Sequence, residues 1–182
     1  MGPHVAGLRA RGIDARAVDL PKGKAERAVP VFATLLAAGS GIAVGGHSFG
    51  GRVASLAVAD ACDGGRPPLA LVLLSYPLHA PGRPDDWDAR TVHWPRITCP
   101  VILLTGSSDP FATPALLERA LAERLPSAEL VTYPKLGHGL ASVLDDVLDR
   151  VAAFAHAAAA STAAREETTD GALASGLGLP VT

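Results

Sequence analysis

Three residues whose side chains could carry out nucleophilic catalysis occur along the chain in the order serine, aspartate, histidine. Ser48 lies in the motif GHSFG (residues 46–50), Asp109 in TGSSDPF, and His138 in KLGHGL. A serine hydroxyl is a weak nucleophile until a base removes its proton, and histidine has a suitable basicity near neutral pH. An aspartate can hold the imidazole in the required tautomer. The three residue types therefore suit acyl transfer through an acyl-serine intermediate.

The residues around the serine predict a tight turn between a strand and a helix. Gly46 and Gly50 would let the chain turn sharply without a clash of Cβ atoms. His47 takes the variable position of the G-x-S-x-G pattern, and the backbone N–H of Phe49 would point at a developing oxyanion. We expect Ser48 to be held on this strained turn as a nucleophile.

Each of the three residues also has an ordinary structural explanation. Ser48 could cap the helix that follows it, Asp109 could cap the turn before Pro110, and His138 could be a loop histidine between glycines. Their order, and their positions after three different predicted strands, favour the catalytic hypothesis. The chain has no metal-ligand spacing and no glycine-rich phosphate-binding motif, so we predict no metal and no cofactor.

The alternation of predicted strands and helices indicates the fold that would position these residues. Short apolar runs indicate five strands, at residues 13–20, 42–45, 69–75, 101–105 and 128–133. Helical periodicity indicates helices at residues 1–12, 24–38, 49–61 and 114–125, and between about 139 and 160. This pattern is typical of a three-layer α/β/α sandwich with a mostly parallel sheet. Active sites in such sheets form beyond the carboxyl ends of the strands, where the three residues fall.

Two stretches lack the periodicity of helices or strands. Residues 76–100 are rich in proline, and we expect them to line a pocket, with Tyr76, Pro77 and His79 as pocket candidates. The alternative is that this segment only packs over the edge of the sheet. Residues 161–182 are rich in Ser, Thr, Gly and Glu and predict a disordered tail after a single domain at residues 1–160.

Composition excludes several classes of protein. The net charge is -2 without a long basic run, which disfavours nucleic-acid binding. No apolar run reaches the ~18 residues of a membrane span. Cys62 and Cys99 do not form a CxxC pair and are typical of reduced thiols. We therefore expect a cytoplasmic protein whose partner is a small acyl substrate, and composition leaves the oligomeric state open.

With these motifs, the chain resembles the α/β-hydrolase superfamily, most of all its dienelactone-hydrolase-like members and their KANL/Tex-type domain. The resemblance covers about residues 1–154 and rests on GGHSFGGRVAS, on SYPLHAPGRP with RTVHWPRITCPVILLTGSSDPF, and on GHGL. It implies the α/β-hydrolase fold, the triad roles of Ser48, Asp109 and His138, and no cofactor. The expected activity is hydrolysis of a small ester, lactone or thioester. Some relatives serve in protein complexes, so a non-catalytic interaction module is the alternative.

The resemblance also implies an incomplete N-terminal part of the sheet. By the family's pattern, the strand predicted at residues 13–20 is the fourth of eight, and the loop that ordinarily supplies a second oxyanion donor precedes it. We therefore expect either that the protein begins upstream of Met1 or that its fold has lost this loop.

Overall fold

A computed structural model describes residues 2–39 and 41–175 of the chain. Its strands are β1 (Ala43–His47), β2 (Ala70–Leu74), β3 (Val101–Gly106) and β4 (Glu129–Tyr133). They form one parallel sheet in the order β1-β2-β3-β4. The helices are α1 (Gly2–Arg9), α2 (Ala25–Ala37), α3 (Phe49–Asp63), α4 (Trp87–Thr91), α5 (Pro114–Arg124) and α6 (Leu144–Ser175). Three short 3₁₀ turns, Pro84–Asp86, Trp94–Arg96 and Ala141–Val143, complete the described elements.

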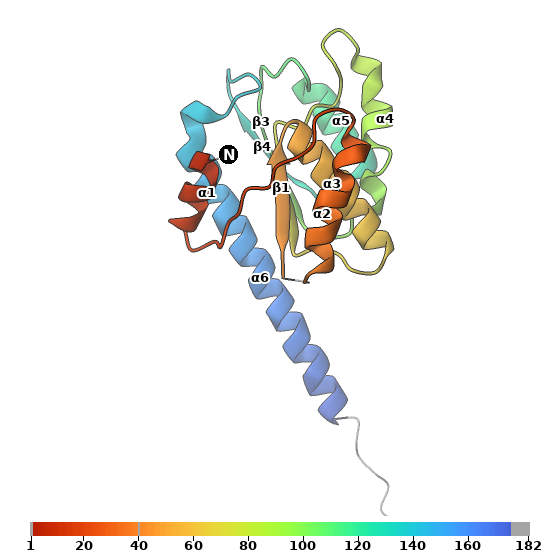
Figure 1. Cartoon of the computed structure of the whole chain (residues 1–182), viewed down its shortest axis with the longest axis vertical. Helices are drawn as coiled ribbons and strands as arrows, with labels where there is room; N and C mark the ends of the chain where they lie inside the picture. Colours follow the sequence, from red (N-terminus) through yellow and green to blue (C-terminus); the bar gives the residue numbers. More distant parts are fainter. Residues whose placement is uncertain (1, 40, 176–182) are drawn as a thin grey trace, which may run out of the picture.

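The two inner strands are buried on both faces, which creates a three-layer arrangement. Every residue of β2 and β3 is buried. Leu71 and Leu73 join the core on the face covered by α2, α3 and α5, while Val72 and Leu74 join a second core with α6. Figure 1 shows the helices on both sides of the sheet. The predicted three-layer α/β/α fold with a parallel sheet is therefore confirmed.

The prediction of a strand at residues 13–20 is wrong. The structure has no strand there, and the segment runs without regular structure from α1 to α2. Of its side chains only Ala15 is buried, and Arg16 pairs with Asp14 near the surface. A strand inside a parallel sheet needs apolar side chains on both faces. This segment offers too few, so the described residues contain four strands and not five.

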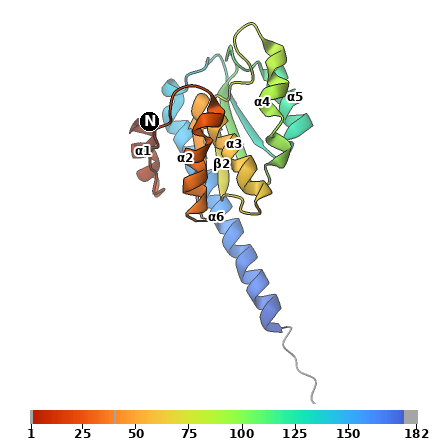
Figure 2. The ribbon, with the colours of Figure 1, turned by 45° about the vertical axis from the view of Figure 1, so that its right-hand side comes forward.

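The C-terminal boundary also differs from the prediction. Helix α6 continues to Ser175, so the disorder predicted from Ser161 is corrected for residues 161–175, whereas residues 176–182 lie outside the described part. Alanine is the best helix former, and a helix that is already nucleated extends at little cost. The alanines at residues 157–160 carry the helix past the sheet, as Figures 1 and 2 show.

The cysteines and the helices also bear on the expectations from composition. Cys62 and Cys99 are free thiols, and burial raises the pKa of Cys99 to about 12. Within the described residues, no helix combines the length and the apolar character needed to cross a membrane.

Candidate active site

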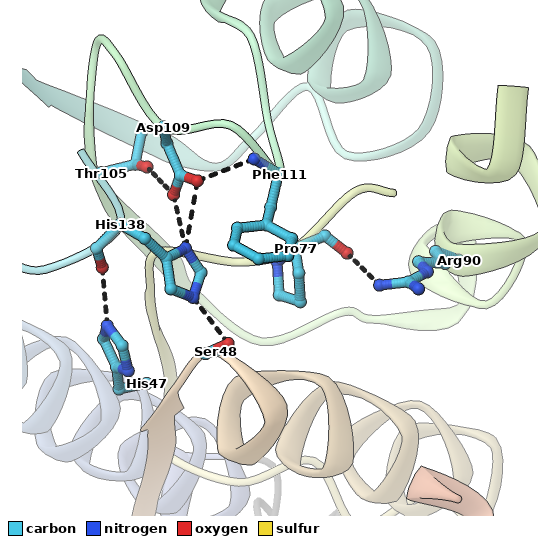
Figure 3. Close-up of polar contacts among 8 residues, drawn as sticks. All are labelled: His47, Ser48, Pro77, Arg90, Thr105, Asp109, Phe111 and His138. Carbon is cyan, nitrogen blue, oxygen red and sulfur yellow. Dashed lines mark hydrogen bonds and ion pairs between the residues drawn. The ribbon is translucent and has the colours of Figure 1, made fainter. Parts of the chain in front are cut away.

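The carboxyl ends of β1, β3 and β4 bring Ser48, Asp109 and His138 together. His138 Nε2 lies 2.7 Å from Ser48 Oγ. His138 Nδ1 lies 2.8 Å from Asp109 Oδ2 and 3.1 Å from Oδ1. Figure 3 shows the three side chains in one hydrogen-bonded series. In this series the carboxylate accepts from one ring nitrogen while the other faces the hydroxyl, which is the arrangement a general base needs.

Ser48 sits at a strained backbone position between β1 and α3. Its φ is 53° and its ψ is -115°, a conformation that L-residues rarely adopt. Its N–H donates to the carbonyl of Leu74 on the neighbouring strand at 2.8 Å, which holds the turn against the sheet. The side chain makes no cap hydrogen bond to α3. The hydroxyl therefore faces the histidine and does not serve as a helix cap.

Close backbone contacts explain two of the glycines around the turn. A Cβ on Gly46 would lie 2.5 Å from the carbonyl carbon of Gly50 and 2.7 Å from the N atom of Gly51, and a Cβ on Gly51 would lie 2.8 Å from the carbonyl oxygen of Gly46. At Gly50 the nearest atom to such a Cβ is Leu20 Cδ1 at 3.9 Å. The expectation that Gly46 avoids a clash is confirmed. The same expectation for Gly50 is wrong, since a Cβ there has room, whereas one on Gly51 would clash with the Gly46 carbonyl.

Asp109 is held rigidly in the interior. Its side chain is fully buried, and its Oδ1 accepts a hydrogen bond of 2.9 Å from the N–H of Phe111. The hydroxyl of Thr105, the penultimate residue of β3, donates to Oδ2 at 3.4 Å. Asp109 thus stabilises its own loop, as the structural explanation expected, and also contacts His138. Burial with fixed donors keeps the carboxylate aimed at the imidazole.

The imidazole of His138 is fixed by two ring neighbours. The ring of Phe111 lies 4.5 Å away and the ring of His47 lies 5.1 Å away, centroid to centroid. Nε2 of His47 is 2.9 Å from the carbonyl oxygen of His138. About a quarter of the His138 side chain remains exposed, at 24%. The imidazole is therefore positioned by packing while it stays accessible to a small molecule.

The N-terminus of α3 lies directly after the serine. Phe49 is the first residue of α3, and no described residue accepts a hydrogen bond from its N–H. Free N–H groups at a helix N-terminus and the helix dipole both favour negative charge. Among the described residues, the N–H of Phe49 is therefore free beside Ser48, and its role as an oxyanion donor stays a prediction.

The pocket candidates occupy different places. Pro77 lies beside Phe111 in Figure 3, and its carbonyl accepts from Arg90 at 3.1 Å. Tyr76 is fully buried in the core, where its hydroxyl donates to the carbonyl of Arg90 at 2.7 Å and its ring packs 5.1 Å from that of Trp94. Figure 3 therefore draws Pro77 near Phe111, whereas Tyr76 packs into the core.

His79 is buried close to the aspartate loop. Its backbone N–H donates to the carbonyl of Phe111 at 3.1 Å, and its Nδ1 donates to the carbonyl of Ala80 at 2.8 Å. Its Nε2 has no hydrogen-bond partner among the described residues. These contacts tie the start of the proline-rich segment to the loop that carries Asp109. The later part of the segment packs on helices, with α4 against α5 and the turn Trp94–Arg96 against α3.

Sequence reasoning did not assign a role to Phe111 or Thr105. Phe111 stands two residues after Asp109, the spacing at which an aspartate carboxylate accepts from a backbone N–H. That spacing could have identified the turn, but the ring contact with His138 depends on the tertiary fold. In the described part of the chain, no group of three or more His, Cys, Asp or Glu side chains is placed to hold a metal ion.

The fold and this arrangement of side chains define an α/β protein with a serine, histidine and aspartate at its strand ends. Residues 21–169 match the family model described as "Alpha/beta hydrolase domain". The chain therefore belongs to the α/β-hydrolase family. No similar sequence is found among curated proteins.

Solved structures with the same fold include hydrolases of several kinds. A monoacylglycerol lipase of Paleococcus ferrophilus has a TM-score of 0.69 and 14% identity, over 84% of this chain and 88% of the lipase. An alpha-beta serine hydrolase homologue from Coxiella burnetii has a TM-score of 0.57 and 15% identity, over 82% and 74%. A puromycin-hydrolyzing peptidase of Mycobacterium tuberculosis has a TM-score of 0.51 and 23% identity, over 72% of this chain and 25% of the peptidase. At these identities the likeness shows the fold alone.

Proposed function

We propose that the chain is a serine hydrolase that cleaves a small ester, lactone or thioester through an acyl-serine intermediate. The observation that carries the proposal is the series Ser48–His138–Asp109, with 2.7 Å and 2.8 Å between the successive polar atoms. Membership of the α/β-hydrolase family supports it. The motifs that resemble dienelactone-hydrolase-like and KANL/Tex-type domains point to the same reaction class.

In the first half of the proposed reaction, Ser48 Oγ attacks the carbonyl carbon of the substrate while His138 Nε2 takes the hydroxyl proton. The carbonyl oxygen becomes an oxyanion that accepts from the N–H of Phe49. Asp109 stabilises the imidazolium through Nδ1. The oxyanion then re-forms the carbonyl, the bond to the leaving oxygen or sulfur breaks, and the leaving group takes the proton from His138. The acyl group remains on Ser48.

In the second half, a water molecule attacks the acyl carbon and gives a proton to His138. The second tetrahedral oxyanion collapses, the bond from the acyl carbon to Ser48 Oγ breaks, and the serine recovers its proton from His138. The products are a carboxylic acid and the free enzyme. These two half-reactions need no cofactor, and His138 accepts and returns each proton that is transferred.

The immediate surroundings of Ser48 support a small acyl group. The ring of Phe111, 4.5 Å from that of His138, places apolar surface beside the imidazole, and Figure 3 draws Pro77 next to Phe111. The monoacylglycerol lipase among the structures of the same fold makes an ester a reasonable first substrate to test. We therefore expect p-nitrophenyl acetate to be hydrolysed faster than esters of long acyl chains.

Labelling with a fluorophosphonate probe tests the proposal directly. The wild-type chain should be labelled, and Ser48→Ala should not be, because loss of the nucleophile in a working triad removes about 10⁶ of turnover. Ser127→Ala changes an exposed serine far along the chain from the turn and is the matched control, which should be labelled like the wild type. A folded wild-type chain that resists the probe would overturn the proposal and favour the non-catalytic interaction module.

A further inference from the structure

A histidine next to the serine contacts the backbone of the catalytic-base loop. His47 is the last residue of β1 and precedes Ser48 in the chain. Its Nε2 lies 2.9 Å from the carbonyl oxygen of His138, which is 91 residues away in sequence. Because a carbonyl only accepts, this contact requires a proton on Nε2 of His47. One side chain therefore joins the turn that carries the nucleophile to the loop that carries the base.

The hydrogen bond from His47 is the contact that holds the His138 end of this loop. Gly137 and Gly139 flank His138, and glycines give a loop conformational freedom. No described backbone N–H donates to the His138 carbonyl, and His47 is the donor found for it in the described part of the chain. Without this hydrogen bond, the earlier part of the loop would still be held by the N–H of Ser108, which donates to the Leu136 carbonyl at 2.8 Å. The imidazole would keep its side-chain contacts, but no other described group would hold the His138 carbonyl itself.

We infer that His47 is a positioning residue, which sets the distance between Ser48 Oγ and His138 Nε2 by holding the His138 carbonyl. This inference rests on the proposed function for its effect on rate. His47 itself has no step in the reaction, since its Nε2 points at a backbone carbonyl (Figure 3). A small misplacement of a general base lowers the rate of proton transfer because the reacting atoms leave hydrogen-bond reach.

Three substitutions separate the hydrogen bond from the packing of the ring. His47→Leu keeps apolar bulk and removes the donor. His47→Gln places an amide N–H near the position of Nε2, and His47→Asn places one nearer to Nδ1, too short to reach the carbonyl. We expect His47→Leu and His47→Asn to be labelled about tenfold more slowly by the fluorophosphonate, the loss expected for one hydrogen bond. The labelling rate of His47→Gln should lie within about threefold of the wild-type rate.

The kinetics of p-nitrophenyl acetate hydrolysis give a second readout. The inference expects kcat to fall in His47→Leu while KM changes by less than about twofold, because His47 does not contact the substrate. Equal rates for the leucine variant and the wild type would overturn the inference. So would a glutamine variant as slow as the leucine variant when both unfold at the wild-type temperature.

A readout independent of hydrolysis keeps this inference separate from the proposed function. The proton that His138 Nδ1 shares with Asp109 should give a strongly downfield proton resonance, identified by its absence in Asp109→Asn. We expect this resonance to broaden by solvent exchange in His47→Leu and to persist in His47→Gln. If the wild type is never labelled, the proposed function fails and the resonance still tests the role of His47. An unchanged resonance in His47→Leu would overturn that role.

Discussion

Gly46 and Gly51 approach each other so closely across the turn that carries Ser48 that neither position has room for a side chain. A Cβ on Gly51 would lie 2.8 Å from the carbonyl oxygen of Gly46. The same turn holds Ser48 at a φ of 53°. The close approach lets α3 begin directly behind the serine. The position of the Ser48 hydroxyl therefore depends on a contact between two backbones.

The first prediction compares alanine at two neighbouring glycines of α3. Gly51→Ala should lower the free energy of unfolding by about 1–3 kcal/mol, because the Gly46 backbone has to move away from the new methyl group. Gly50→Ala should be neutral or stabilise by up to about 1 kcal/mol, since its Cβ has space and alanine favours a helix. Urea unfolding measures both values. Equal effects of the two substitutions would contradict the role of the close contact.

The second prediction concerns the end of β3. A Cβ on Gly106 would collide with the carbonyl oxygens of Leu136 and Gly137, in the loop that leads to His138. Gly106→Ala should displace this loop and slow fluorophosphonate labelling of Ser48 by about 10²-fold, the cost of a misplacement of about 1 Å.

Gly139→Ala is the matched control for this second prediction. Gly139 lies in the same loop, and nothing is within 4 Å of its Cβ position. This variant should be labelled at close to the wild-type rate. Normal labelling of Gly106→Ala in a folded protein would show that the contact does not position the histidine.

The third prediction concerns the buried carboxylate. Asp109→Asn preserves the size of the side chain but removes the charge that faces His138 Nδ1, so the labelling rate should fall by about 10⁴-fold. Thr105→Val removes only the long hydrogen bond of 3.4 Å to Oδ2 and should cost less than about tenfold. The time course of fluorophosphonate labelling compares the two variants. A threonine variant as slow as the asparagine variant would mean that Thr105 controls the carboxylate.

Much of the fold could be predicted because its inner strands carry an unambiguous signal. The run that forms β2 is apolar at every position and the run that forms β3 is apolar over its first four, as expected of strands covered on both faces. Helix α5 begins at Pro114 after Thr113, as a proline at the first helical position predicts. Asp109 and His138 each follow a strand in the chain, so their positions at the carboxyl ends of β3 and β4 could be predicted as well.

The errors arose where local pattern and tertiary context disagree. Residues 13–20 contain apolar residues that suggest a strand, but only Ala15 is buried. Gly50 and Gly51 are adjacent glycines that the sequence alone does not tell apart. Only the close approach of the Gly46 backbone shows that Gly51 is the one without room for a Cβ. The contact of His47 with the His138 carbonyl joins positions 91 residues apart, and no local pattern predicts it. The helix beyond Ser161 reflects propagation from a packed segment and not periodicity.

His93, a buried histidine outside the group of Ser48, Asp109 and His138, should make the stability of the fold depend on pH. His93 is only 4% exposed, and its Nε2 lies 2.8 Å from the hydroxyl of Ser55 on α3. Burial, together with the charges of Arg52 and Arg96, lowers the pKa of His93 from 6.5 to about 4. The folded protein therefore keeps this imidazole neutral at pH values where the unfolded chain protonates it.

The fourth prediction follows from the sign of this shift. Between pH 6.5 and about 4, the unfolded chain binds a proton at His93 that the folded protein does not, so stability falls as the pH falls through this window. The loss approaches about 1.4 kcal/mol per pH unit and totals about 3 kcal/mol. His93→Gln keeps a polar group near Ser55 and does not titrate, so its unfolding free energy should fall less steeply with acid. Urea unfolding at about pH 7.5 and about pH 4.5 measures both proteins, and contributions from other titrating groups cancel in the comparison. Parallel losses of stability in the two proteins would show that His93 is not the group that binds the proton.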